Sequence, residues 1–304
     1  MKILANDGLD KIAADAFEAA GMNVDQGHYD QEDLENKIKN VDVLIVRSAT
    51  KVNKQIIDAA LGGRLKLVIR AGVGIDNIDA QYAREKGIAV QNTPNASSDS
   101  VAELVIGHMF GLARFISISN VTMRDGKWNK KAYEGIELSG KTLGIIGFGR
   151  IGRSLAQKAK GLGMEVIFND IFVKEDKQFK YVQFDELISN ADFISVHTPY
   201  TGAPLIGKAE FEKMKQGVFI INAARGKVVD EQALMEALNT DQVKGAGIDV
   251  FEKEPAVNLE LINHPKVSAT PHIGAATKEA QKRIGKEIID AVMKLNHKII
   301  DKAV

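Results

Sequence analysis

Short runs of aliphatic and β-branched residues alternate along the chain with longer stretches in which apolar residues recur with helical periodicity. The runs have the length and composition of buried strands, and the longer stretches are typical of amphipathic helices. Strands are expected at Lys2–Ala5, Val41–Arg47, Leu65–Arg70 and Ile88–Gln91, and again at Thr142–Ile146, Glu165–Phe168, Phe193–Val196, Val218–Ile221, Gly245–Asp249 and Val267–Ala269. The alternation predicts an α/β protein with two series of parallel strands, of Rossmann-like or flavodoxin-like type.

Helices are expected between the strands, for example at Leu9–Ala20 and Asn53–Ala60. Asp230 and Thr277 precede two further periodic stretches, and both residue types commonly cap helix N-termini. The stretch Ser98–Met123 lies between the two strand series and is apolar around most of its circumference. We expect a buried helix there, packed either in the core of the chain or against another subunit.

The composition is that of a globular protein and excludes several classes of function. The chain has 304 residues, and a typical domain has roughly 100–200, so two domains are expected. Its 40 basic and 40 acidic residues cancel, which gives no sign of a nucleic acid or an anionic membrane as partner. The chain has no cysteine. Disulfides, thiolate metal sites and cysteine nucleophiles are therefore excluded, and we expect no metal.

The N-terminal sequence MKILANDGLDKIA lacks the apolar core of a signal peptide. No stretch approaches the roughly 18 consecutive apolar residues that a membrane span requires. We therefore expect a cytoplasmic protein without a membrane-spanning segment.

The segment Gly147–Gly152 reads GFGRIG and matches the pattern G-x-G-x-x-G. It follows the expected strand TLGII and precedes a helical stretch, which is the context of a dinucleotide-binding loop. Glycines allow the backbone to approach a pyrophosphate, whose charge then lies at the positive end of the helix. We call this segment the glycine loop.

The next strand ends at Asp170, 18 residues after Gly152. An acidic side chain at this point binds the ribose hydroxyls of an adenosine and repels a 2′-phosphate, so the cofactor is expected to be NAD rather than NADP. The alternatives are a glycine-rich turn without a ligand and the similar sheet of a methyltransferase.

Polar residues follow the expected strands, where ligands bind in open α/β sheets. In the second series they are His197-Thr198-Pro199, Asn222-Ala223-Ala224-Arg225-Gly226, Asp249 and Thr270-Pro271-His272; in the first they are Arg47-Ser48, Arg70-Ala71-Gly72 and Asn92-Thr93-Pro94. Two such edges facing each other would form an active-site cleft between the domains.

Three of these strand-end regions supply the groups needed to oxidise a hydroxyl-bearing carbon. His272 suits proton transfer near neutral pH. Arg225 offers a planar fork for a carboxylate. Glu254 could pair with His272 and favour its protonated form. Taken singly, each has a structural reading as a turn histidine, a strand-end ion pair or a solvated carboxylate, but the set beside a cofactor loop favours chemistry.

The remaining histidines carry less signal. His28 and His264 lie in expected turns, and His108 lies on the buried helical stretch, so structural roles are expected for all three. His197 directly follows a strand and is expected to line the cofactor site.

Several runs resemble one enzyme family over essentially the whole chain. GKTLGIIGFGRIG, NAARGKVVDEQAL, GAGIDVFEKEP and TPHIGAAT are similar to segments of the D-isomer-specific 2-hydroxyacid dehydrogenases. VRSATKV, IRAGVGIDNID, NTPNASSDSVAE and RDGKW are most similar to the phosphoglycerate dehydrogenase branch of that family.

The resemblance implies roles for individual residues. Arg225 would bind the substrate carboxylate, His272 would be the acid/base and Glu254 its partner, while Asp249 would contact the nicotinamide side of NAD. The implied cofactor site comprises Val73, Gly147, Gly149, Arg150, Ile151, Gly152, Asp170, His197, Thr198, Pro199, Ala223, Ala224, Arg225, Asp249, His272, Gly274 and Ala275. The implied substrate site comprises Arg47, Ser48, Arg70, Gly72, Val73, Gly74, Asn92, Lys130, Arg225 and His272.

A phosphorylated substrate needs cations beyond Arg225. Arg47 and Arg70 follow strands, and Lys130 would reach the site from a neighbouring subunit; Arg47 could equally be structural. The expected reaction is oxidation of 3-phospho-D-glycerate to 3-phosphohydroxypyruvate, the first step of serine biosynthesis. The alternatives are reduction of glyoxylate, hydroxypyruvate or a D-lactate-type keto acid, and, in another class, an NADH-sensing binding protein.

The resemblance also implies a discontinuous architecture. Residues 1–97 and 276–304 would form the substrate-binding domain, and residues 98–275 the NAD-binding domain. The family dimerises through the NAD-binding domain, so a homodimer is expected, with a tetramer as the alternative, and residues 98–123 would lie at the interface. The chain ends at Val304, without room for the C-terminal regulatory modules of longer phosphoglycerate dehydrogenases, so serine feedback inhibition is not expected.

Overall fold

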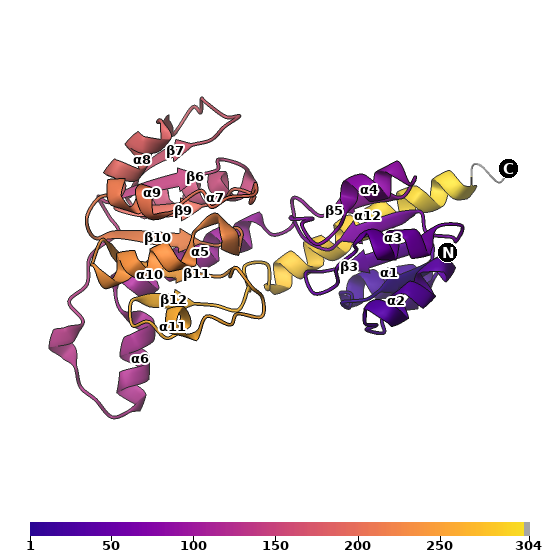
Figure 1. Ribbon diagram of the computed structural model, residues 1–304, viewed down its shortest axis with the longest axis horizontal. Helices are drawn as coiled ribbons and strands as arrows, with labels where there is room; N and C mark the ends of the chain where they lie inside the picture. The colour runs from indigo at the N-terminus through magenta and orange to yellow at the C-terminus, as the bar shows by residue number, and fades with distance from the viewer. Residues whose placement is uncertain (301–304) are drawn as a thin grey trace. The chain divides into compact units, whose positions relative to one another are not determined.

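The computed structural model describes the chain from residue 1 to residue 300, and its side chains as far as residue 296. The chain divides into two compact units (Figure 1). The first contains Met1–Ser97 and the segment that starts at Ala275, and the second contains Ser98–Gly274. Each unit has one parallel sheet with helices on both faces. The prediction of an α/β protein with two parallel sheets is confirmed.

The sheet of the first unit has five strands in the order β2-β1-β3-β4-β5. They are β1 (Lys2–Ala5), β2 (Asn23–Asp25), β3 (Val43–Val46), β4 (Leu67–Arg70) and β5 (Ala89–Asn92). The central strands are almost wholly buried and aliphatic, because parallel strands are covered on both faces. The register aligns Val46 with Arg70 and Arg70 with Asn92. The carboxyl ends of β3, β4 and β5 therefore lie at one edge.

Helices cover both faces of this sheet. They are α1 (Lys11–Ala19), α2 (Gln31–Lys37), η1 (Ile38–Asn40), α3 (Lys54–Ala60), α4 (Ala80–Glu85) and α12 (Lys278–Ile300). Phe17 of α1 and Ile288 of α12 belong to the core on one face. Ile56 of α3 and Ala83 of α4 belong to the core on the other. The last helix, yellow in Figure 1, thus shares a core with the N-terminal strands.

The sheet of the second unit has seven strands in the order β12-β11-β10-β9-β6-β7-β8. They are β6 (Thr142–Ile146), β7 (Glu165–Asn169), β8 (Lys180–Tyr181), β9 (Phe193–Val196), β10 (Val218–Asn222), β11 (Val243–Ile248) and β12 (Val267–Ala269). The chain starts in the middle at β6, builds outward to β8, and then returns to build β9 to β12 on the other side. This is a doubly wound sheet, whose order reverses between β6 and β9.

Helices of the second unit cover both faces of its sheet. They are α5 (Ser98–Ala113), α6 (Ile116–Arg124), η2 (Lys130–Ala132), α7 (Arg150–Gly161), α8 (Phe184–Asn190), α9 (Lys208–Lys213), η3 (Gly226–Val228), α10 (Glu231–Asn239) and α11 (Leu259–Ile262). Of these, α6 and η2 contribute no buried residue. The core on one face contains residues of α5 and α7. The core on the other face contains residues of α8, α9 and α10.

The expected stretch Ser98–Met123 forms two helices rather than one. The carbonyl of Ala113 accepts a hydrogen bond from the N–H of Ile136 at 2.9 Å, and Phe115 takes a left-handed φ of 56°. The axis of α6 is bent by 62° from that of α5. Within the described chain, α5 contributes to the core but no residue of α6 is buried. The expectation of one continuous helix is therefore wrong, and burial of α6 against another subunit stays a prediction.

The apolar pattern identifies every strand except the two short ones at sheet edges, β2 and β8. Their sequences, NVD and KY, are partly exposed and too short to show an alternation. No single helix in residues 1–300 is long and apolar enough to cross a membrane. The pair α5 and α6 reaches that length and hydropathy only together, across its bend.

Candidate active site

The glycine loop connects β6 to α7 in the second unit, and two of its glycines are required by close contacts. Gly147 has a φ of 94°, and a Cβ there would lie 2.7 Å from the carbonyl oxygen of His197. A Cβ on Gly152 would lie 2.3 Å from the carbonyl oxygen of Gly147. By contrast, a Cβ on Gly149 would meet nothing within 4 Å. The loop is therefore packed against α7 and β9 but open at Gly149, as backbone contact with a phosphate requires.

Asp170 directly follows β7 and holds the glycine loop. Its Oδ2 accepts a hydrogen bond from the N–H of Phe148 at 2.7 Å, and its Oδ1 accepts from Phe172 and Val173 at 2.8 and 3.0 Å. Burial alone would raise the pKa of Asp170. The three N–H groups and the nearby Lys174 outweigh it and hold the pKa below its usual value. The carboxylate is therefore ionised, as recognition of ribose hydroxyls requires.

Buried polar atoms without a protein partner lie next to the loop. Burial lowers the pKa of His197 to about 4, so its ring is neutral, and its Nε2 is 2.9 Å from Oγ of Ser195. Among the described residues, Nδ1 of His197 and Oγ1 of Thr198 have no hydrogen-bond partner. Buried polar atoms are normally paired, so this wall of the loop fits a polar ligand such as a dinucleotide.

Arg225 follows β10 in a turn that the buried Asn222 clamps. Oδ1 of Asn222 accepts from the N–H of Ala224 at 3.1 Å, and its Nδ2 donates to the carbonyl of Arg225 at 2.9 Å. The guanidinium of Arg225 donates to the carbonyl of Ala224 at 2.6 Å. The turn is thus fixed by side chain and backbone together, which limits the positions that the guanidinium can reach.

Glu254 and His272 are in direct contact. Oε2 of Glu254 is 2.7 Å from Nδ1 of His272, and its Oε1 accepts from the N–H of Phe251 at 3.2 Å. Half-burial alone would raise the pKa of Glu254. The contact with His272, the Phe251 N–H and the charge of Arg225 together lower it below its usual value. The geometry therefore brings Arg225, Glu254 and His272 into one electrostatic group.

Asp249 is 1% exposed, and its contacts lie within its own unit. Its Oδ1 accepts from Oγ1 of Thr270 at 2.7 Å and from the N–H of Ile273 at 2.8 Å, and its Oδ2 accepts from the N–H of Gly274 at 2.9 Å. These groups belong to the segment Thr270–Gly274, which we call the His272 loop. The contact between Asp249 and the nicotinamide side of NAD that the resemblance implied stays a prediction.

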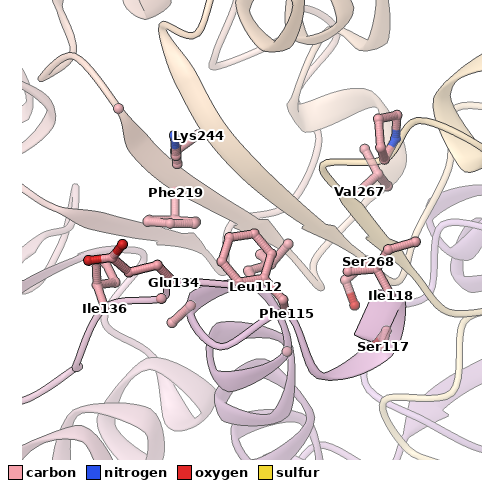
Figure 2. Close-up of a pocket in the computed structure, with 15 residues that line it drawn as sticks. Leu112, Phe115, Ser117, Ile118, Glu134, Ile136, Phe219, Lys244, Val267 and Ser268 are labelled. Atoms are coloured by element: carbon pink, nitrogen blue, oxygen red, sulfur yellow. The ribbon is translucent and has the colours of Figure 1, made fainter. Parts of the chain in front are cut away.

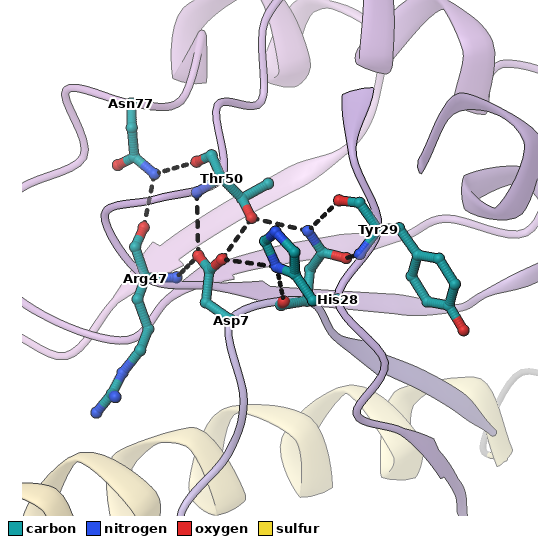
Figure 3. A network of polar contacts seen from close by, with 7 residues as sticks. Asp7, His28, Tyr29, Arg47, Thr50 and Asn77 are labelled. Carbon is teal, nitrogen blue, oxygen red and sulfur yellow. Dashed lines mark hydrogen bonds and ion pairs between the residues drawn. The ribbon is translucent and has the colours of Figure 1, made fainter. Parts of the chain in front are cut away.

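In the first unit, the loop after β3 is held by residues that the sequence analysis did not select (Figure 3). Asp7 accepts from the N–H groups of Arg47 and Thr50 at 2.6 and 3.1 Å, and from Oγ1 of Thr50 at 2.7 Å. Nδ2 of Asn77 donates to the carbonyls of Arg47 and Thr50, each at 2.7 Å. The position of Asp7 just past β1 is the only sequence signal for this role.

The other strand-end residues of the first unit gather at the same edge of the sheet. The guanidinium of Arg70 lies so close to Gly72 that a Cβ there would come within 1.3 Å of it. Nδ2 of Asn92 donates to the carbonyl of Val73, and the guanidinium of Arg47 donates to Oε1 of Gln281 on α12. Ser48 is exposed after β3, and Gly74 lies in the loop after β4.

The remaining predicted residues are spread over the second unit and its boundary. Arg150 and Ile151 start α7, Ala223 and Ala224 follow β10, and Pro199 follows Thr198. Gly274 and Ala275 lie at the boundary between the two units. Lys130 is exposed in η2, on the segment after α6. The approach of Lys130 to the site from a neighbouring subunit stays a prediction.

The sequence of the second unit matches a known family model. Residues 106–274 match the D-isomer-specific 2-hydroxyacid dehydrogenase NAD-binding domain. The chain belongs to this family. It is an NAD-dependent D-2-hydroxyacid dehydrogenase, which confirms the predictions of family, activity class and cofactor.

Relatives of this dehydrogenase differ in their substrates. The hydroxypyruvate reductase of Thermotoga maritima is 46% identical over 300 residues, which cover 96% of this chain and 97% of that protein. The D-3-phosphoglycerate dehydrogenase of Methanocaldococcus jannaschii is 43% identical over 97% of this chain, which spans only 57% of that protein. The D-lactate dehydrogenase of Aquifex aeolicus, solved with NAD and lactic acid, has a TM-score of 0.86 and 29% identity, covering 99% of this chain and 97% of its own.

The tight packing at Gly152 leads to a prediction about NADH binding. Gly152→Ala places a methyl group against the carbonyl of Gly147 and should push α7 away from the glycine loop. We expect NADH affinity to fall by about tenfold or more, a loss of roughly 1.4 kcal/mol. Fluorescence titration with NADH measures the change.

Gly161→Ala is the matched control. It lies in the same helix, and its Cβ would meet nothing within 4 Å. We expect it to leave NADH affinity unchanged and to stabilise the helix by about 0.5–1 kcal/mol. Equal NADH affinities for the two variants would contradict the packing argument.

Proposed function

We propose that the enzyme oxidises 3-phospho-D-glycerate to 3-phosphohydroxypyruvate, with His272 as the acid/base. The observation that carries the acid/base assignment is the 2.7 Å contact between Nδ1 of His272 and Oε2 of Glu254. An ionised carboxylate can only accept, so Nδ1 carries a proton and donates it to this bond. The neutral ring then has its lone pair at Nε2, where it can take the proton of a substrate hydroxyl.

The protein groups around His272 favour this proton transfer. As Nε2 takes the proton, the ring becomes positively charged, and the Glu254 carboxylate stabilises that charge. Arg225, in the turn clamped by Asn222, offers its guanidinium to the substrate carboxylate. NAD, held at the glycine loop and Asp170, supplies the hydride acceptor when it is bound.

The phosphate is assigned to the first unit, which we propose as the substrate-binding domain with residues 276–304; residues 98–275 would be the NAD-binding domain. Arg47 and Arg70 stand at the adjacent carboxyl ends of β3 and β4. Asp7 and Asn77 hold the backbone on either side of the Arg47 side chain. A substrate with one carboxylate has no need of two further arginines, whereas a phosphorylated acid does.

Hydroxypyruvate is the second candidate substrate. The observation that favours it is the likeness to the T. maritima hydroxypyruvate reductase, which extends over 97% of that protein. In this case Arg225 and His272 would keep their roles, acting in the direction of reduction. Arg47 and Arg70 would then serve the structure of the strand-end loops.

The acid/base assignment predicts the effect of His272→Ala. Loss of the group that transfers the proton should lower kcat by about 10²- to 10⁴-fold, the usual contribution of a general acid or base. NADH affinity should remain unchanged, because the glycine loop and Asp170 are untouched. Steady-state turnover and NADH titration together measure the two effects, and full activity in this variant would overturn the assignment.

Glu254→Gln tests the charge of the pair separately from its hydrogen bond. The pKa of Glu254 is lower in the folded protein than in the unfolded chain. The free energy that its charge contributes to folding is therefore fully present above the pKa of the unfolded chain, and it is lost as the pH falls through the pKa of the folded protein. At neutral pH the wild-type carboxylate is therefore charged, and the amide removes that charge. We expect reductase activity, which needs the protonated ring, to fail at a lower pH than in wild type. An unchanged pH profile would contradict this.

A substrate panel with Arg47→Met distinguishes the two substrates. If Arg47 binds phosphate, the variant should lose about 10- to 100-fold in kcat/KM for 3-phosphoglycerate, the equivalent of a charge-assisted hydrogen bond. Activity on hydroxypyruvate should change little. Lys66→Met is the control, because it also removes one positive charge, but at the amino end of β4 rather than at its carboxyl end. Equal losses on both substrates would refute the phosphate assignment.

We also propose that the second unit forms the interface of a homodimer, as the family resemblance implies. Helix α6 exposes Ile116, Ile118, Val121 and Met123 by 38–54%, and Trp128 follows it with 78% exposed. A mainly apolar pocket of about 250 Å³ continues this surface (Figure 2), where Leu112, Phe115 and Ile118 line it together with residues of β10 and β12. Monomeric proteins rarely leave so much contiguous apolar surface in water.

The dimer proposal predicts a change of mass on substitution. The double variant Ile118→Glu and Val121→Glu places charges on α6 and should convert the dimer to a monomer, as measured by size-exclusion chromatography with light scattering. Ile12→Glu is the control, because Ile12 is 48% exposed on α1 of the first unit. A wild-type enzyme that is itself monomeric, or a double variant that stays dimeric, would overturn the proposal.

A further inference from the structure

His108 lies on α5, is 3% exposed, and uses both ring nitrogens. Its Nδ1 is 2.9 Å from Oγ of Ser268, and its Nε2 is 3.1 Å from Oγ1 of Thr270. Ser268 belongs to β12, and Thr270 directly follows that strand at the start of the His272 loop. A residue of the buried helix is thus connected to the loop that presents the proposed acid/base.

The direction of each hydrogen bond follows from the carboxylate at one end. Oδ1 of Asp249 can only accept, so the hydroxyl of Thr270 donates to it. Oγ1 of Thr270 must then accept from Nε2–H of His108, and Nδ1 of His108 accepts from the hydroxyl of Ser268. Burial lowers the pKa of His108 and outweighs the opposing charge of Asp249, which agrees with a neutral ring carrying one proton.

The other contacts of Asp249 show what this chain of hydrogen bonds holds. Asp249 accepts from the N–H groups of Ile273 and Gly274, directly after His272, and from Thr270 before it. His272 has a φ of 52°, a left-handed conformation that is unfavourable for a residue with a side chain. The loop therefore needs restraint on both sides of His272, and the Asp249 carboxylate provides it.

Close packing leaves the His108 ring little freedom. A Cβ on Gly247 of β11 would lie 2.7 Å from Cβ of His108. The His108 side chain therefore packs on the face of the sheet at a position where only glycine leaves room for it. An apolar side chain of similar size would fill this space as well. It would remove the acceptor of the Ser268 hydroxyl and the donor to Oγ1 of Thr270, which would keep only its bond to Asp249. Lost hydrogen bonds to partly buried hydroxyls cost stability. The ring nitrogens of His108 therefore make two hydrogen bonds that an apolar side chain of the same volume cannot make.

We propose that His108 is a positioning residue for the reaction: through Thr270 and Asp249 it fixes the left-handed turn that presents His272 to Glu254. This rests on the acid/base role proposed for His272. His108 itself is buried and does not touch the reacting atoms. Its effect reaches the reaction only through the geometry of the His272 loop.

His108→Leu and His108→Gln form the test pair. Leu fills the space without polar atoms, whereas the Gln amide can donate from near the position of Nε2. We expect His108→Leu to lower kcat by about tenfold with the KM for NADH unchanged, and His108→Gln to recover most of the loss. If His108 only stabilised the fold, kcat would not fall at an unchanged KM, and the Gln amide would not restore kcat.

A second measurement observes His272 without relying on turnover. In ¹³C-histidine-labelled enzyme, the ring resonance of His272 is assigned by its absence in His272→Ala. It should shift in His108→Leu and return toward the wild-type position in His108→Gln. If His108→Leu fails to fold, Thr270→Val and Thr270→Ser replace the pair, because valine removes the hydroxyl at equal size and serine keeps it.

The outcomes separate this inference from the proposed function. Wild-type kcat and an unmoved His272 resonance in His108→Leu, with His272→Ala inactive, would overturn the role of His108 alone. Full activity in His272→Ala would overturn the proposed acid/base, whereas a shifted resonance in His108→Leu would still show that His108 positions the loop. A fall in kcat that His108→Gln does not reverse would count against positioning.

Discussion

The direction of the strands is the constraint on which the rest of the structure depends. Within residues 1–300, every strand pair of both sheets is parallel. Parallel strands end at the same edge, so the chain must leave each one through a loop at that edge. The buried strands have little choice of sequence, but the first residues after them are free to be polar. Chemistry therefore concentrates at strand ends, and each sheet has only one such edge to offer.

A loop at a strand end is useful for binding only if its backbone is fixed, and this chain repeatedly uses one device for that purpose. A carboxylate or amide at the end of a strand, or just past it, binds the backbone of its own loop or of a neighbouring one. Asp7 holds the loop after β3, Asp170 holds the glycine loop, Asn222 holds its own turn, and Asp249 holds the His272 loop. Each places a short, partly or wholly buried polar side chain where N–H groups would otherwise lack partners. The longer side chains of these loops, such as Arg47 and Arg225, then extend from a fixed backbone.

The parts of this arrangement that the sequence predicts are those with a local pattern. Buried strands, the glycine loop and the polar strand ends all follow from short segments, and the structure shows Glu254 next to His272 although 18 residues separate them. At the break before Phe115, the carbonyl of Ala113 binds the N–H of Ile136, which is remote in sequence, and the apolar pattern of 98–123 does not show this contact. The contact of His108 with Ser268 and Thr270 spans 160 residues or more. A histidine within an apolar helix gives no sign of such a partner.

The same reasoning explains why the reaction is easier to infer than the substrate. Arg225 would meet a carboxylate that every candidate acid carries, and His272 would act on the hydroxyl or carbonyl beside it. Neither group can therefore distinguish one acid from another. Discrimination requires a contact with what differs between the acids, such as a phosphate, and in the proposed assignment Arg47 and Arg70 would provide the charge for it. Such long side chains bind through charge rather than through a rigid fit, and Arg47 already has a protein partner in Gln281. The energy that a phosphate gains there is its attraction to Arg47 less the contact with Gln281 that it displaces, and this difference decides whether the enzyme prefers phosphorylated acids.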